Sequence, residues 1–367
     1  MSNVFEYLKQ YGSFSFRERE FGNVDSLILA QFCYLKADGM IPTLKEEAEA
    51  VSLRFLSEHP DREKLFADER FEKNNRKLFE LMCHSVRFQD IRFRDYVNIV
   101  DEQIGTQFSA MTVELGEDMY YIAFRGTDET LVGWKEDFCM AFSGSVPSQD
   151  YSVVYATQIA ERVSGKFYMG GHSKGGNLAV YAALRCPEDV VNRIKRIYSF
   201  DGPGFRPEVL ECERYQQVRP KIKKFIPQSS VIGMVLQSQE RYVVVKSRAA
   251  GLLQHDPYTW LVAGGEFVRS DSLYKGRRIM DKALNEWILS LPEEQIRRFV
   301  NNLFDILYAS EKDNLIDFGK EWKQSIRHMV EAYKELDASE KKFMLRILGK
   351  LFSIQSRCLL QGEKKHE

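Results

Sequence analysis

Residues 166–181 read Lys-Phe-Tyr-Met-Gly-Gly-His-Ser-Lys-Gly-Gly-Asn-Leu-Ala-Val-Tyr, and this stretch decides the fold. A short apolar run leads into a Gly-x-Ser-x-Gly pattern centred on Ser173, and a helical pattern follows at once. Strand, sharp turn and helix in that order form the context in which this pattern marks a nucleophilic serine. We therefore expect Ser173 on a strained turn above a sheet edge, with its hydroxyl open to a base and a substrate.

The residues around Ser173 meet the requirements of such a turn. Glycines two positions before and two after the serine avoid side chains where strand and helix approach closely. The helix that follows directs its first N–H groups and its dipole at a developing negative charge. The backbone N–H of Lys174 is therefore a predicted donor to an oxyanion. The alternative interpretation is a glycine-rich turn without catalysis.

The sequence on both sides of this turn indicates the α/β class. Residues 107–124 read as a hairpin that leads into a buried strand. Further runs of strand type lie at 193–200, 221–226 and 241–246. Stretches with helical spacing at 148–163 and 176–185 precede the predicted strands at 166–169 and 193–200, which indicates crossover units and a mainly parallel central sheet flanked by helices.

Helical sequence lies on either side of the predicted sheet. Residues 25–94 read as mainly helical, and residues 267–360 are rich in Leu, Lys, Glu and Arg at helical spacing. We predict an α/β domain over residues 1–265, including the N-terminal helices, and a C-terminal helical extension over residues 266–367. Three roles stay open for the extension: packing on the first domain, forming a lid, or joining homo-oligomers. Its basic faces are interpreted as solvated rather than membrane-binding.

Composition excludes several classes of function. Lys plus Arg number 52 and Asp plus Glu number 53, and there is no basic stripe interleaved with aromatic residues, so we expect no nucleic-acid partner. No apolar run approaches the ~18–20 residues that span a bilayer, and the N-terminus lacks the pattern of a secretory signal. The six cysteines are scattered, which favours reduced thiols over disulfides or a metal site. We expect a cytoplasmic protein without cofactor, metal or integral membrane segment.

Two further motifs precede the serine. Phe124-Arg125-Gly126-Thr127 places a polar turn after the buried strand, and Trp134-Lys135-Glu136-Asp137 follows. With Gly-His-Ser-x-Gly-Gly-x-Leu-Ala, these motifs resemble the class 3 lipases. The sequence looks closest to a bacterial branch of unknown function marked by Gly-His-Ser-Lys-Gly-Gly-Asn-Leu-Ala. The likeness covers roughly residues 25–260 and implies an α/β-hydrolase fold.

The resemblance also implies roles for individual residues: Ser173 as the nucleophile, Thr127 as the oxyanion residue and His255 as the base. Chain order in this fold agrees, because the base belongs on a loop after the last strand and His255 alone of the six histidines fits. His172 is expected to pack under the turn. The other interpretations are a strand-end turn residue for Thr127 and a buried structural histidine for His255.

The acid of the triad departs from the family pattern. Class 3 lipases place it after the strand that here is 221–226, but this sequence continues Pro227-Gln228-Ser229-Ser230. One strand earlier, Asp201 stands directly at the end of 193–200, and we predict that it holds the base in position. The competing interpretation is that Asp201 caps the turn that follows it.

These residues predict a serine hydrolase that cleaves carboxylic esters, with a small-molecule ester or a lipid as substrate, through an acyl-serine intermediate. Two alternatives stay open. One is an acyltransferase that passes the same acyl group to another acceptor. The other is a binding or regulatory module with weak catalysis, which the missing acid after Pro227 supports.

Overall fold

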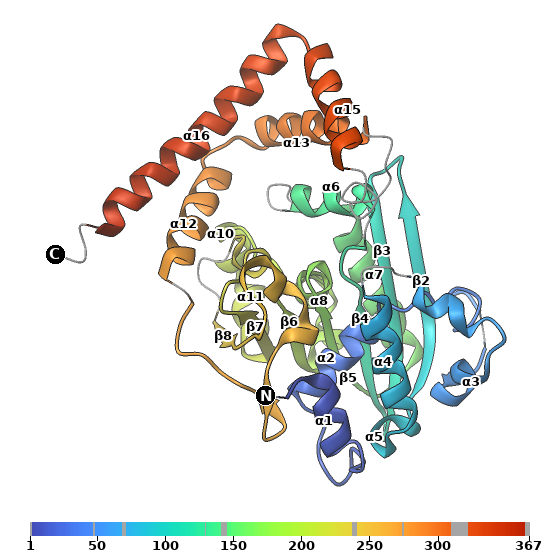
Figure 1. The fold of residues 1–367 in the computed structure, drawn as a ribbon. Coiled ribbons are helices and arrows are strands. Elements are labelled where there is room, and N and C mark those ends of the chain that lie inside the picture. Colours follow the sequence, from blue (N-terminus) through green and yellow to red (C-terminus); the bar gives the residue numbers. More distant parts are fainter. Residues whose placement is uncertain are drawn as a thin grey trace.

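A computed structural model describes residues 2–46, 48–67, 71–128, 130–140, 145–236, 241–273, 275–309 and 322–363 (Figure 1). Within these ranges, eight strands form one sheet in the order in which they occur along the chain. The strands are β1 Val51–Ser52, β2 Arg92–Asp101, β3 Thr106–Gly116, β4 Met119–Phe124, β5 Lys166–His172, β6 Ile194–Phe200, β7 Ile222–Pro227 and β8 Tyr242–Val245. β1 to β4 pair antiparallel, whereas β4 to β8 pair parallel. The predicted α/β class with a mainly parallel sheet is confirmed.

Helices cover both faces of the sheet, as Figure 1 shows. The helices of the N-terminal segment are α1 Val4–Tyr11, α2 Asn23–Phe32, α3 Leu53–Glu58, α4 Glu72–Cys83 and α5 Val86–Gln89. α1, α2 and α4 bury their apolar residues against one face. α7 Pro147–Arg162 and α8 Lys174–Arg185 build the core of the opposite face. Since both faces are covered, the parallel strands read as nearly continuous apolar runs.

Shorter elements complete this part of the chain. They are α6 Leu131–Met140, α9 Glu188–Arg193, α10 Pro207–Leu210, α11 Glu213–Val218, the hairpin strands β9 Val262–Ala263 and β10 Glu266–Phe267, and the 3-10 turns η1 Arg62–Phe66, η2 Arg219–Lys221, η3 Ile232–Met234, η4 Gly251–His255 and η5 Pro257–Thr259. The expectation of helix up to residue 94 is wrong at its end, where β2 begins at Arg92. The register of β2 shifts between Arg94 and Val97, which breaks the alternation that marks a strand in sequence.

The C-terminal helices form a separate apolar cluster above the carboxyl ends of the strands (Figure 1). These helices are α12 Lys275–Leu289, α13 Glu293–Tyr308, α15 Trp322–Glu335 and α16 Ala338–Glu363. Their cluster also takes in Leu131 of α6 and Leu236 of the segment after β7. The extension is therefore packed on the first part of the chain, while its boundary at residue 266 stays a prediction.

Candidate active site

Ser173 stands on a sharp turn between β5 and α8. Its φ of 56° and ψ of −131° lie in a region that costs a non-glycine residue about 1–3 kcal/mol. The flanking glycines permit the turn: a Cβ on Gly171 would lie 2.4 Å from the carbonyl oxygen of Phe124, and one on Gly175 only 2.1 Å from that oxygen. The strand, turn and helix around Ser173 are those that the sequence predicts.

Three of the predicted site residues meet at the carboxyl edge of the sheet. Nε2 of His255, the last residue of η4, lies 3.1 Å from Oγ of Ser173. Nδ1 of the same ring lies 2.6 Å from Oδ2 of Asp201. Asp201 is fully buried, whereas the His255 side chain is 15% exposed. The three side chains thus form a continuous hydrogen-bonded chain from a buried carboxylate to the serine hydroxyl.

The surroundings of Asp201 fix its carboxylate directly after β6. Its φ of 51° turns the chain sharply after the strand, and its N–H donates to the carbonyl oxygen of Phe225 in β7 at 2.7 Å. Oδ1 accepts a hydrogen bond from Oγ of Ser230 at 2.5 Å, so both carboxylate oxygens have a partner. Ser230 occupies the segment after β7, where the class 3 pattern would place the acid itself.

His172 is buried next to Ser173 and lies against the backbone of His255. Its Nε2 is 2.9 Å from the carbonyl oxygen of His255, and its Nδ1 is 3.0 Å from the hydroxyl of Tyr34. The two imidazole rings lie 4.6 Å apart, centroid to centroid. Since His172 is fully buried, its ring holds the backbone of His255 and is closed to solvent.

The loop with Thr127 lies directly against Ser173. A Cβ added to Gly126 would lie 3.2 Å from Cβ of Ser173. Oγ1 of Thr127 donates to Oδ2 of Asp137 in α6, and Gly133 of α6 packs so closely that a Cβ there would lie 2.8 Å from Cγ2 of Thr127. On the other side of the serine, the N–H of Lys174 belongs to the first turn of α8, where N–H groups have no partner within the helix.

The side chain of Lys174 forms a buried ionic cluster beside the site, which the sequence did not predict. Its ammonium is fully buried and lies 3.0 Å from Oε2 of Glu136, 2.7 Å from the carbonyl oxygen of Gln107 and 3.0 Å from Oε1 of the same glutamine. Glu136 also accepts from Oγ1 of Thr106 and from the N–H groups of Gln107 and Ser148. This cluster ties the start of α8 to β3, α6 and α7.

The two carboxylates of this cluster differ in their electrostatics. Burial disfavours the charged form of Glu136, but the Lys174 ammonium and backbone N–H donors outweigh it and lower the pKa of the carboxyl. Burial raises the pKa of Asp137 to about 6, although the Lys174 ammonium, 3.9 Å from Oδ1, and the Thr127 hydroxyl oppose the shift. The Lys174 ammonium therefore favours the charged forms of both Glu136 and Asp137, beside the loop with Thr127.

Asn177 in the first turns of α8 holds the chain that follows Asp201. Its Nδ2 donates to the carbonyl oxygens of Pro203 and Gly204 at 3.2 and 3.1 Å. Its Oδ1 accepts from Nε2 of Gln149 at 2.8 Å. The asparagine of the Gly-Gly-Asn-Leu-Ala motif thus connects α8 with the chain that follows Asp201.

The remaining motif residues support the site from outside it. Nη2 of Arg125 donates to Oδ1 of Asn98 in β2 at 2.6 Å, and Trp134 packs against the C-terminal cluster. Sequence reasoning missed Glu136 and Ser230. The sequence offered a hint for Glu136, because it directly precedes the motif aspartate Asp137. It offered none for Ser230, which is simply a serine that follows a strand.

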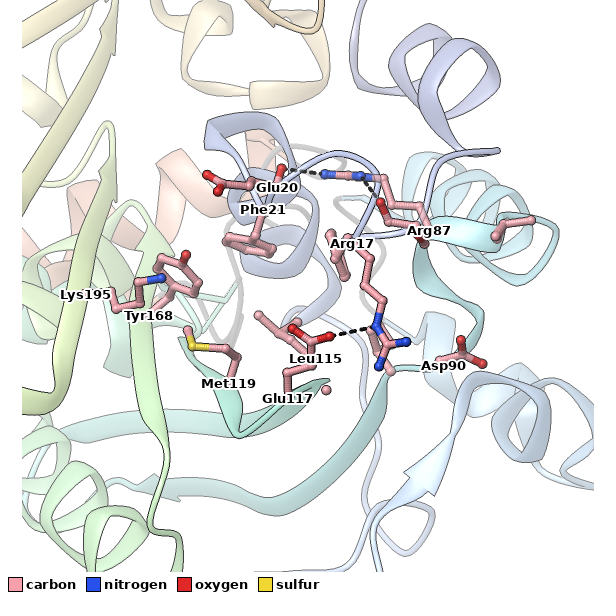
Figure 2. Close-up of a pocket in the computed structure, with 15 residues that line it drawn as sticks. Arg17, Glu20, Phe21, Arg87, Asp90, Leu115, Glu117, Met119, Tyr168 and Lys195 are labelled. Atoms are coloured by element: carbon pink, nitrogen blue, oxygen red, sulfur yellow. Dashed lines mark hydrogen bonds and ion pairs between the residues drawn. The ribbon is translucent and has the colours of Figure 1, made fainter.

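A cavity of about 610 Å³ lies at the other end of the strands (Figure 2). It is lined by Met119 at the start of β4 and by Lys195 near the start of β6, and Arg17 pairs with Glu117 at its rim. Because Ser173 stands at the opposite edge of the sheet, this cavity is no substrate site for that serine. Among the described residues, no group of three or more His, Cys, Asp or Glu side chains could hold a metal ion.

Comparisons with known proteins find similar solved structures and a matching family model. Solved structures similar to this chain include a lipase of Rhizomucor miehei in complex with its propeptide, at 16% identity and a TM-score of 0.33. That similarity covers 43% of this chain and 57% of the lipase chain. The M37 lipase is similar at 14% identity and a TM-score of 0.35, over 57% of this chain and 68% of that chain. A search of curated proteins finds no match.

A family model is more informative. The model described as Mbeg1-like matches residues 82–305, which is more than half of the chain. The matched stretch includes Ser173, Asp201 and His255, and it extends into the C-terminal helices as far as α13. This chain belongs to the Mbeg1-like family.

Proposed function

We propose that this protein is a serine hydrolase that cleaves carboxylic esters. The observation that carries the proposal is the hydrogen-bonded chain from Asp201 through His255 to Ser173, with 2.6 and 3.1 Å between successive partners. A base within hydrogen-bonding reach of a serine, itself oriented by a third group, is the arrangement that activates a hydroxyl nucleophile. Thr127 and the Lys174 N–H are proposed to bind the oxyanion.

In the acylation step, Oγ of Ser173 attacks the ester carbonyl carbon as its proton passes to Nε2 of His255. The buried Asp201 accepts a hydrogen bond from Nδ1 and stabilises the imidazolium. The carbonyl oxygen becomes an oxyanion between the Thr127 loop and the start of α8. When the tetrahedral intermediate collapses, His255 returns the proton to the alkoxy oxygen, and the alcohol leaves.

Water completes the cycle by the same path. It attacks the acyl-serine while His255 takes its proton, and collapse releases the carboxylic acid and restores the Ser173 hydroxyl. We propose a small-molecule ester or a lipid as the substrate and the cytoplasm as the location. No helix in the part of the chain that the structure describes is long and apolar enough to cross a membrane.

The geometry bears differently on the two alternative functions, a weakly catalytic module and an acyltransferase. The case for a module with weak catalysis depended on the missing carboxylate after Pro227, whereas the contact between Asp201 and His255 supports a hydrolase with Asp201 as the acid. An acyltransferase would use the same residues up to the acyl-serine. Product analysis with and without an added alcohol or amine separates transfer from hydrolysis.

The test is labelling by a fluorophosphonate probe, which reacts with activated serines. The wild type should be labelled, Ser173→Ala should not, and the matched control Ser229→Ala, in the segment beside Ser230, should be labelled like the wild type. A folded wild type that stays unlabelled would contradict the proposal. Chromogenic esters of rising acyl length then define the substrate, since a lipase prefers long chains and an esterase short ones.

A further inference from the structure

The segment between β7 and residue 236 is packed on the carboxylate of Asp201. Ser230 donates to Oδ1 of Asp201, and a Cβ on Gly233 would lie 2.3 Å from that same oxygen. The segment is also joined to the chain after Asp201, because the N–H of Gly204 donates to the carbonyl oxygen of Val235 at 2.8 Å. A shift of this segment would therefore move the carboxylate, which leaves its position dependent on whatever holds residues 230–236.

A side chain of the C-terminal extension holds the far end of this segment. Oδ1 of Asn285, in α12, accepts from the N–H of Leu236 at 2.7 Å, and its Nδ2 donates to the carbonyl oxygen of Met234 at 2.9 Å. Leu236 has a φ of 54°, a left-handed conformation that costs a branched residue roughly 1–2 kcal/mol. The two amide hydrogen bonds offset that cost and fix the turn.

The extension also contacts the oxyanion side of the site. The ring of Phe304 in α13 packs edge-on against Phe138 in α6, with 5.7 Å between the centroids. α6 carries Asp137, the partner of Thr127. α12 thus contacts the segment that packs on Asp201, and α13 contacts the helix that carries Asp137. Figure 1 shows both helices on the side of the sheet where the parallel strands end.

We propose that Asn285 is a positioning residue for the acid of the triad. Through residues 230–236 it holds Asp201 at hydrogen-bonding distance from His255, which makes the C-terminal extension part of the support of the active site. The inference rests on the proposed function only in calling Asp201 the acid, since the contacts themselves are independent of turnover.

The experiment compares two substitutions of the same kind. Asn285→Leu removes both hydrogen bonds to the segment and keeps the number and branching of the side-chain heavy atoms. Asn302→Leu is the matched control, because Nδ2 of Asn302 bonds Glu340 and joins α13 to α16 without touching the segment. Each variant is measured for thermal unfolding, for kcat and KM on a soluble chromogenic ester, and for the low-field proton resonance of the His255 Nδ1–H bond, assigned by its loss in His255→Gln.

For Asn285→Leu we expect kcat to fall about tenfold with KM within about twofold, because a carboxylate displaced by a fraction of an ångström orients the base poorly. The low-field resonance should disappear. In an Asp201→Asn background the same substitution should cost nothing further, since it acts through that carboxylate. Asn302→Leu should keep kcat and the resonance even where it lowers the unfolding temperature.

Two outcomes separate this inference from the proposed function. A wild type that hydrolyses esters, with Asn285→Leu equal to Asn302→Leu in kcat and resonance, overturns the inference and leaves the proposed function standing. If the wild type hydrolyses no ester, but the resonance is lost in Asn285→Leu and kept in Asn302→Leu, the proposed function fails and the inference stands. Additive losses in the Asp201→Asn background would also overturn it, because they would show an effect on the fold at large.

Discussion

Replacement of Lys174 by methionine tests the buried ionic cluster at the start of α8. The substitution keeps most of the side-chain volume and removes the ammonium, while Glu136, 1% exposed, keeps its charge. Breaking a buried ion pair by removing one partner costs roughly 3–5 kcal/mol. Since domains are stable by only ~5–15 kcal/mol, the variant should lose a large part of its free energy of unfolding.

The assay is urea unfolding of the wild type, Lys174→Met, and the double variant Lys174→Met/Glu136→Gln. The midpoint of the single variant should fall by about 1–2 M. The double variant should recover at least half of the loss, because the unpaired carboxylate is gone. A single variant within about 1 kcal/mol of the wild type, or a double variant no more stable than the single one, would refute the reasoning.

The pH dependence of the free energy of unfolding tests the same ion pair. In the wild type the lowered pKa of Glu136 contributes stability above the unfolded value of ~4.3, and this is lost as the pH falls through the folded pKa. Without Lys174, burial should raise the pKa of Glu136 above the unfolded value. The stability of the variant is then lost as the pH rises through the folded pKa. The difference between the two proteins should therefore be largest at neutral pH and shrink near pH 4.

Three further predictions concern the site. Asp201→Asn should keep the fold but lower kcat on a chromogenic ester by roughly 10³–10⁴-fold, because it disturbs the tautomer of His255; an activity within tenfold of the wild type would contradict its role. Gly175→Ala should destabilise the protein by more than about 3 kcal/mol in urea unfolding, since its Cβ would lie 2.1 Å from backbone; normal stability would show that the turn is not as described. Asp137→Asn should gain about 1–2 kcal/mol above pH 6, where the raised pKa near 6 leaves a costly charge, and gain nothing below about pH 4; unfolding curves at both pH values decide it.

The parts of the site that depend on consecutive residues could be predicted. The turn at Ser173 follows from local sterics, because glycines at 171 and 175 serve contacts with the neighbouring strand. The position of Asp201 followed from chain order and from the place where its strand ends. The structure adds the hydrogen bonds of His255 to Asp201 and to Ser173. The catalytic roles of these three residues stay predictions.

Other parts depend on contacts between distant segments, which a single sequence does not reveal. Ser230 meets Asp201 because β6 and β7 are neighbours in a particular register. Glu136 stands beside the motif aspartate Asp137, but only the structure shows that it is buried and paired with Lys174. Asn285 lies in an amphipathic helix, where an asparagine is normally solvated. The alternation of β2 is hidden by its register shift after Arg94.

The hydrogen bond of Tyr34 to His172 has a practical consequence for experiments with fragments. Tyr34 lies before residue 82, where the Mbeg1-like match begins, and yet its hydroxyl holds the ring on which the backbone of His255 rests. A protein cut at the limits of that match would lack this phenol and the N-terminal helices that bury one face of the sheet. Loss of activity in such a fragment would report the loss of this support rather than the loss of Ser173, Asp201 or His255, so activity assays of this chain should retain residues 1–81.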